Sequence, residues 1–170
     1  MKEAKLNQYL SSLDKSQLEK EIVELFKLYP QVKEHYNLKA NTKLEEALLN
    51  RYKKKIEEEF EMNKDRDEIK YSAISEAIME FQQISSEPSK KVELMIYYLH
   101  KALNFTNSDV DVEENFYLSI EGVFEKSINI VFKNELEDEF ENEIKELLEK
   151  VSEEEFEFKD NMMNIYSCYY

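Results

Sequence analysis

The sequence predicts an all-α protein, and three observations favour this class. The chain holds one glycine and two prolines in 170 residues, where an average composition would give about twelve glycines. Few irregular loops or tight turns are therefore expected. Apolar residues recur at intervals of three and four along most of the chain, which is the helical period, and no segment alternates with period two.

We expect about seven to nine helices in a single domain over residues 1–170. The first helix is short and carries Leu6, Tyr9, Leu10 and Leu13. Asp14 and Gln17 form a capping box for a second helix. The apolar face of that helix is predicted to face the core and consists of Leu18, Ile22, Leu25, Phe26 and Tyr29. Pro30 ends it and can begin a short helix over residues 31–36.

A capping box of Thr42 and Glu45 predicts the start of a long helix. Its inward residues are Leu44, Leu48, Leu49, Tyr52, Ile56 and Phe60. After a polar connector at 63–68, the next apolar stripe is Ala73, Ile74, Ala77, Ile78, Phe81 and Ile84. The helix over 92–105 is apolar around most of its circumference, so we place it at the centre of the fold.

A helix capped by Asp111 with Glu114 follows a second polar connector. Its apolar stripe is Val112, Phe116, Tyr117, Ile120, Val123, Phe124, Ile128, Val131 and Phe132. The next stripe, which predicts an amphipathic helix, is Leu136, Phe140, Ile144, Leu147, Leu148 and Val151. Ser152 with Glu155, and Val151 with Phe156, predict the capping box and hydrophobic staple of a last helix.

A weak internal echo bears on the architecture. The segment Glu76–Glu80 resembles Glu121–Glu125 at an offset of 45 residues, and each follows an Asn-x-Asp-x-Asp connector, at Asn63 and at Asn107. Periods in the forties are typical of HEAT-like helical pairs. The prediction is therefore either an irregular multi-helix bundle or a short HEAT-like helical stack.

The net charge of −15 is concentrated in the C-terminal third, where residues 134–160 hold 13 acidic and 3 basic groups. This charge disfavours binding to nucleic acid or to an anionic membrane. The acidic segment is either a solvated helix face or a docking surface for a basic protein partner. Its candidate partner-binding residues are Glu137, Asp138, Glu141 and Glu146.

Two further features of the sequence allow a binding or a structural interpretation. Tyr166 and Tyr169, with Met162 and Met163 nearby, suit a contact surface, or they dock the last helix on the core. The basic residues at 51 and 53–55 are interpreted as partners of the glutamates at 57–59 at helical spacing, rather than as a nucleic-acid footprint.

The sequence motifs predict no metal, cofactor or enzyme activity. The connectors at Asn63 and Asn107 lack the sixth-position Gly and the twelfth-position Glu of a calcium loop. His35 and His100 lack the Glu of a di-iron pair, and a single Cys with two distant His residues cannot close a zinc site. Cys168 is too close to the C-terminus for a preorganised nucleophile.

Several features of the sequence favour the cytoplasm. Cys168 is the only cysteine, so no intramolecular disulfide forms, as in a reducing compartment. The first residues lack the apolar region of a secretory signal, and no apolar run approaches the length of a membrane span. A homo-oligomer stays open at this point.

Four segments resemble a family of uncharacterised bacterial helical proteins, a domain of unknown function. They are Leu6–Glu19, Tyr29–Tyr36, Leu94–Tyr98 and Asn115–Ser119. The resemblance implies an all-helical cytoplasmic bacterial protein, and it implies no activity and no functional residue.

Three hypotheses on function remain. The favoured one is a non-enzymatic cytoplasmic protein–protein interaction module. A second is a DNA mimic, whose carboxylates in 134–160 would occupy the groove of a nucleic-acid-binding protein. The third is an enzyme or small-molecule binder with a pocket near the central helix, around His100 and Tyr97 or Tyr98.

Overall fold

The computed structural model describes residues 3–62, 71–107, 112–151 and 156–169, and every regular element in these ranges is an α-helix. The helices are α1 (Glu3–Ser11), α2 (Lys15–Leu28), α3 (Pro30–Ala40), α4 (Thr42–Met62), α5 (Tyr71–Ile84), α6 (Pro88–Thr106), α7 (Glu114–Lys133), α8 (Glu137–Lys150) and α9 (Phe156–Ser167). The all-α prediction is confirmed. Among these residues, no helix combines the length and the apolar character needed to cross a membrane.

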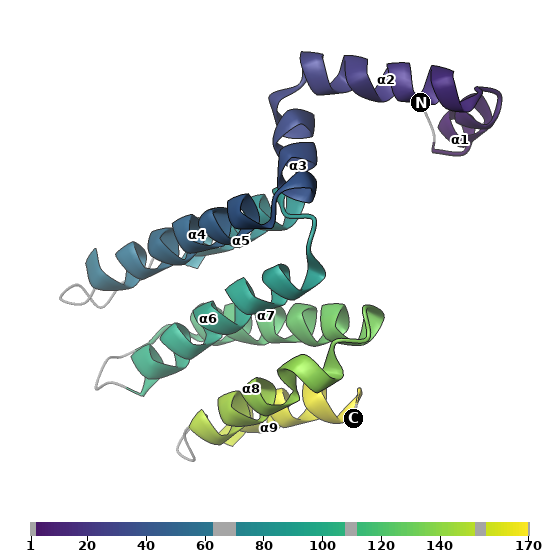
Figure 1. Cartoon of the computed structure of the whole chain (residues 1–170). Helices are drawn as coiled ribbons and strands as arrows, with labels where there is room; N and C mark the ends of the chain where they lie inside the picture. Colours follow the sequence, from purple (N-terminus) through teal and green to yellow (C-terminus); the bar gives the residue numbers. More distant parts are fainter. Residues whose placement is uncertain (1–2, 63–70, 108–111, 152–155, 170) are drawn as a thin grey trace.

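Three helical pairs, α4–α5, α6–α7 and α8–α9, are stacked in chain order (Figure 1). The first helices of the pairs form one row, in which α4 packs against α6 and α6 packs against α8. In the other row, α7 packs against α9. Each pair therefore buries apolar surface both between its own two helices and against its neighbours in the stack, as in repeat architectures.

Helix α6 is the centre of the core, as its apolar circumference predicts. It packs against α4, α5, α7 and α8. Its buried residues are Val92, Leu94, Met95, Ile96, Tyr98, Leu99, Ala102 and Leu103. Burying a side chain of this size contributes about 1.5–3 kcal/mol, so α6 holds a large share of the folding free energy.

The internal echo of the sequence marks equivalent places in successive pairs. Glu76–Glu80 lies in α5 and Glu121–Glu125 lies in α7, and these are the second helices of the first and second pairs. The apolar residues at matching positions of the echo are buried: Ala77 and Ile78 in α5, and Val123 and Phe124 in α7. The echo is therefore a packing pattern that recurs in consecutive pairs.

The first three helices form an N-terminal arm, defined as residues 3–40. The apolar stripe of its second helix predicts a position in the core. Only α3 packs against the stack, on α4 and α5, and α2 extends beyond it (Figure 1). No residue of α1 or α2 is buried. The prediction that Leu18, Ile22, Leu25, Phe26 and Tyr29 face the core is wrong, because none of these five residues is buried and the main contact of α2 is with α3.

The capping predictions have mixed outcomes. Asp14 and Gln17 form the expected capping box, with both hydrogen bonds present. In the predicted box of Thr42 and Glu45, the Thr42 side chain lies outside the described residues, the Asn41 side chain accepts a hydrogen bond from the Lys43 backbone N–H, and Glu45 turns into the core. Asp111 and the Ser152–Glu155 box lie outside the described residues, and α7 begins after Glu113 with no side-chain cap.

Two predicted inward residues point to solvent instead. Leu44 is exposed, because the side of the first turn of α4 that faces the fold is taken by Glu45, which is buried. Phe156 is 74 % exposed while Val151 is buried, so the predicted hydrophobic staple between them is wrong. The remaining inward residues predicted for α4 are buried: Leu48, Leu49, Tyr52, Ile56 and Phe60.

Candidate protein-interaction site

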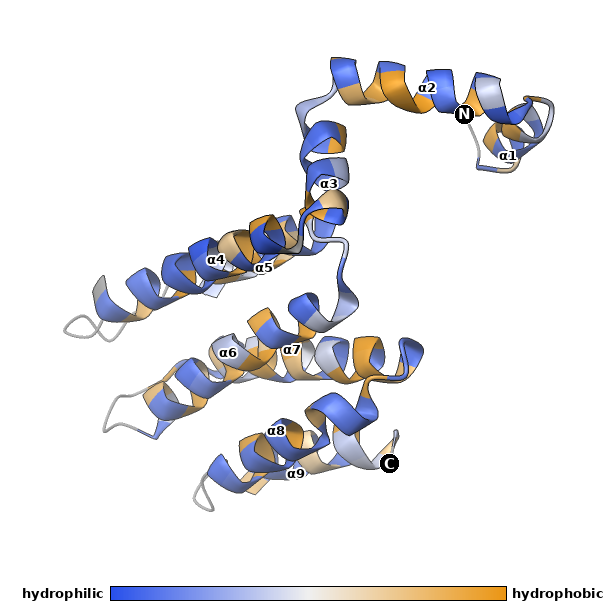
Figure 2. Cartoon of the chain, in the orientation of Figure 1, coloured by the Kyte–Doolittle hydropathy of each residue, from blue (hydrophilic) through white to orange (hydrophobic). Residues whose placement is uncertain are grey.

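The N-terminal arm carries a large exposed apolar surface, which we call the arm surface. It consists of Leu6, Tyr9, Ile22, Val23, Leu25, Leu28, Tyr29 and Tyr36. Each of these residues is between 38 and 70 % exposed, and orange bands along α2 and α3 mark the apolar part in Figure 2. Summed over these eight residues, roughly 800 Å² of surface stays in water, distributed over α1, α2, α3 and the turn between α2 and α3.

Local interactions give the arm a fixed shape without a core. The capping box at Asp14 starts α2, and Pro30 sits at the first position of α3, where its missing N–H is not needed. The Tyr9 hydroxyl donates to the Glu21 carboxylate over 2.9 Å, which ties α1 to α2, and this hydrogen bond raises the pKa of Tyr9. The apolar surface is therefore held on helices rather than on a flexible tail.

A cavity of about 360 Å³ lies where α2 turns into α3. Its lining residues are Ile22, Leu25, Gln31, Val32, His35, Tyr36 and Gln83. His35 is half-buried in this lining and meets Tyr36 edge-on. Most of the wall is apolar, and Gln31, His35 and Gln83 add polar groups, which is the composition of a site that takes an apolar side chain.

The arm differs from the rest of the chain in charge. Residues 3–40 hold six basic and six acidic groups, whereas residues 41–170 hold 16 basic and 32 acidic groups. The acidic pair α8–α9 lies at the end of the molecule opposite α1 and α2 (Figure 1). A partner can therefore approach the arm without entering the most negative part of the molecule.

The four candidate acidic residues all lie on α8, as the predicted amphipathic helix implies. Asp138 and Glu146 are exposed, whereas Glu137 and Glu141 are half-buried beside the apolar face. The Glu141 carboxylate lies 2.6 Å from the Lys145 Nζ in an ion pair. Helix α8 therefore presents Asp138 and Glu146 to solvent, with Glu141 neutralised within the helix.

The two candidate tyrosines pack on the body of the protein. Tyr166 and Tyr169 are half-buried against the core. The Tyr169 hydroxyl accepts a hydrogen bond from the Asn129 side chain at 3.2 Å, and its ring lies 5.3 Å from that of Phe132. Their contacts dock α9 on α7, so they already have an intramolecular role.

The basic residues of α4 form ion pairs both within α4 and with other helices. Lys54 pairs with Glu58 four residues on, at 3.7 Å, at the predicted helical spacing. The others form pairs from Arg51 to Glu34 in α3, Lys53 to Glu93 in α6, and Lys55 to Glu80 in α5. These side chains connect the arm and the first two helical pairs.

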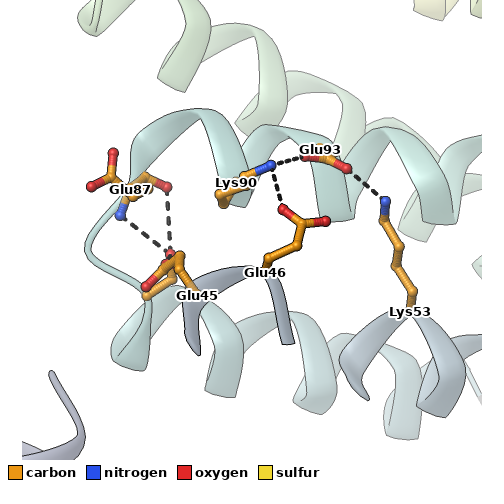
Figure 3. A network of polar contacts seen from close by, with 7 residues as sticks. Glu45, Glu46, Lys53, Glu87, Lys90 and Glu93 are labelled. Atoms are coloured by element: carbon orange, nitrogen blue, oxygen red, sulfur yellow. Dashed lines mark hydrogen bonds and ion pairs between the residues drawn. The ribbon is translucent and has the colours of Figure 1, made fainter. Parts of the chain in front are cut away.

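Lys90 is the centre of a polar network between α4 and α6 (Figure 3). Its Nζ lies 2.9 Å from Glu46 and 2.8 Å from Glu93, and the second oxygen of Glu93 lies 2.7 Å from Lys53. Burial raises the pKa of Glu93, but the hydrogen bonds from Lys53 and Lys90 outweigh it and hold this pKa below its usual range. The network fixes the register of α4 on α6.

Glu45 is a buried carboxylate that sequence reasoning assigned to a cap. It is 2 % exposed and accepts a hydrogen bond from the Ser85 hydroxyl at the end of α5. The Glu87 backbone N–H donates to the same hydroxyl, as Figure 3 shows. The pattern Asn-Thr-x-x-Glu fits both a cap and a tertiary contact, so no signal in the sequence separates the two.

The residues of the small-molecule hypothesis contact different neighbours. Tyr98 is buried in the core, and burial raises its pKa to about 12. The Tyr97 ring lies 5.5 Å from the Nζ atoms of both Lys53 and Lys101, on the α4 side. The His100 Nδ1 lies 2.9 Å from the Lys150 Nζ of α8, and burial together with this charge lowers the pKa of His100. Among the described residues, no three His, Cys, Asp or Glu side chains are grouped to hold a metal ion.

The fold and this surface define an all-α protein of stacked helical pairs with an exposed apolar arm. The chain belongs to a family of unknown function, DUF6155, whose model matches residues 1–170. No curated protein and no solved structure matches the chain.

Proposed function

We propose that this protein is a non-enzymatic protein–protein interaction module that binds through its arm surface. The observation that carries the proposal is the N-terminal arm, where α1 and α2 bury no residue while eight apolar side chains stay exposed. Folding leaves this area in water, and a stable interface would cover about as much on each partner. Tyrosine, which makes up three of the eight, is enriched at such interfaces.

We place this module in the cytoplasm of a bacterial cell. The free thiol of Cys168 is exposed, and such a thiol persists in a reducing compartment. The bacterial assignment follows from the resemblance described above.

Affinity capture with matched variants tests the arm surface. The full chain is the bait in a lysate of its native host, in four forms: wild type, Leu28→Glu in the arm, Leu118→Glu on α7, and Asp138→Asn with Glu146→Gln on α8. Leu28 is 70 % and Leu118 is 55 % exposed, so both glutamates are placed in solvent and neither is expected to disturb folding.

We expect a stoichiometric partner, either another protein or an untagged copy of this chain. It should bind the wild type, Leu118→Glu and the α8 variant, and its binding should be lost with Leu28→Glu. A partner lost only with the α8 variant and at high salt would support the acidic docking surface instead. If Leu28→Glu captures the partner as well as the wild type does, the assignment of binding to the arm is overturned.

A further inference from the structure

We propose that the arm surface is a homodimer interface, in which two copies of this chain join arm to arm around a two-fold axis. The inference rests on the proposed function, because it names the partner of the same surface. Area, charge and shape of the arm each favour a second copy as that partner.

The size of the arm surface suits a symmetric dimer. Each copy brings the same roughly 800 Å² of exposed apolar side chains, and about 800 Å² per partner is the contribution to a stable interface of standard size. A two-fold dimer uses the same patch twice, so no second surface is needed. A contact that covers all eight residues on both copies would therefore reach the size of a stable interface, and one chain supplies both halves of it.

The distribution of charge directs two copies to meet at their arms. Two chains of net charge −15 repel each other, and the repulsion is strongest where residues 134–160 meet. The arm has balanced charge and lies at the opposite end of the stack, as Figure 1 shows. A basic partner would be drawn to α8, whereas an equally acidic second copy approaches most easily at the arm.

The cavity between α2 and α3 has a counterpart on the same arm. Leu28 and Tyr29 lie at the end of α2, and Leu28 is 70 % exposed. Ile22, Leu25 and Val32 line a cavity of about 360 Å³ beside them, which holds one or two apolar side chains. In a two-fold dimer Leu28 of each copy enters the cavity of the other, so both cavities are filled by one symmetric contact.

Sedimentation equilibrium of the full chain tests this dimer. The wild type is measured from about 1 to about 200 µM, and at about 50 and about 500 mM NaCl. Leu28→Glu is the disruptive variant and Leu118→Glu is the matched control, and circular dichroism checks that both keep the helical content. The two variants add the same charge, so a general rise in repulsion affects both alike.

We expect a wild-type mass of twice 20.5 kDa at the upper concentrations. Leu28→Glu should raise the dimer dissociation constant by about 100-fold, because the substitution acts once in each copy at about tenfold each. Leu118→Glu should change it by less than about threefold. High salt should leave the dimer unchanged or tighten it, because salt screens the repulsion between acidic chains.

A mass of 20.5 kDa at every concentration overturns the homodimer. A dimer that Leu28→Glu leaves intact, or that dissociates at high salt, also overturns it. A monomer in sedimentation with arm-dependent capture of another protein would contradict this inference alone and support the proposed function. A monomer with no arm-dependent capture would contradict both.

Discussion

Gly122 lies at a position that suits a residue with a side chain, and Glu135 lies at a position that suits glycine. Gly122 lies inside α7 with an ordinary backbone, and a Cβ built there meets no atom within 4 Å. Glu135 follows α7 with a φ of 56°, in the left-handed region, and the Leu136 N–H closes the turn on the Val131 carbonyl at 3.0 Å. Glycine is the residue that adopts this conformation at a helix end without strain.

Replacing Gly122 by alanine and Glu135 by glycine should each stabilise the protein. Gly122→Ala should raise the free energy of unfolding by about 0.5–1 kcal/mol, because alanine restricts the unfolded chain and favours the helix. Glu135→Gly should raise it by about 1 kcal/mol, because it relieves the left-handed strain. Denaturant unfolding measures both free energies. The contrast is the double variant Gly122→Ala with Glu135→Ala, because alanine at position 135 keeps the left-handed strain. A loss of stability in Glu135→Gly would contradict the turn geometry.

The buried Tyr98 predicts a loss of stability in alkali. Burial raises its pKa from 10.0 to about 12 in the folded protein, and its hydroxyl makes no hydrogen bond of ordinary length among the described residues, although the Ser119 side chain is close enough to oppose this rise. Stability from the neutral form is complete below pH 10 and is lost as pH rises from 10 to about 12. The slope in this range approaches about 1.4 kcal/mol per pH unit.

Tyr98→Phe should remove this part of the alkaline loss and cost less than about 1 kcal/mol at neutral pH, because no hydrogen bond is broken. The measurement is the free energy of unfolding between neutral pH and pH 11, with the exposed position Tyr29→Phe as the control. Equal alkaline slopes for Tyr98→Phe and the wild type would show that Tyr98 does not govern the transition.

At the scale of single helices, periodicity predicts the face but not what covers it. The stripes of α6, α7 and α8 were predicted and are buried, because each of these helices has neighbours in the stack. Leu18, Ile22 and Leu25 of α2 have the same spacing and are not buried. The difference comes from tertiary contacts, which a helical period does not encode. The arm surface could therefore be found in the sequence as a stripe, but not as an exposed one.

The contact of Glu45 with Ser85 connects two elements, α4 and the end of α5. Ser85→Ala removes the hydroxyl that donates to the buried carboxylate and should cost about 1–3 kcal/mol. Ser127→Ala is the matched control, because Ser127 is also buried but donates only to the Phe124 carbonyl of its own helix, at 2.7 Å. It should cost less than about 1 kcal/mol, since that carbonyl keeps its helical hydrogen bond. Chemical denaturation measures both, and equal losses would contradict a tertiary role for Ser85.

At the scale of the whole molecule, the sequence predicts the class and the centre of the fold but leaves the arrangement open. The helical period identified the helices, and the broad stripe at 92–105 located the central one. The two connectors at Asn63 and Asn107 pointed to successive pairs, but two weak copies could not decide between a stack and a bundle. The position of the arm depends on which helices α3 contacts, and these contacts join residues far apart in the chain.

The two ends of the stack differ in a way that limits growth. One end is closed by the acidic pair α8–α9, in which α8 exposes Asp138 and Glu146, and a further acidic chain would be repelled there. The other end offers an arm of balanced charge with exposed apolar side chains. A chain with a single associating end forms a closed pair and has no surface left for a third copy. The acidic cap at one end therefore prevents the exposed apolar arm at the other end from leading to open-ended fibres.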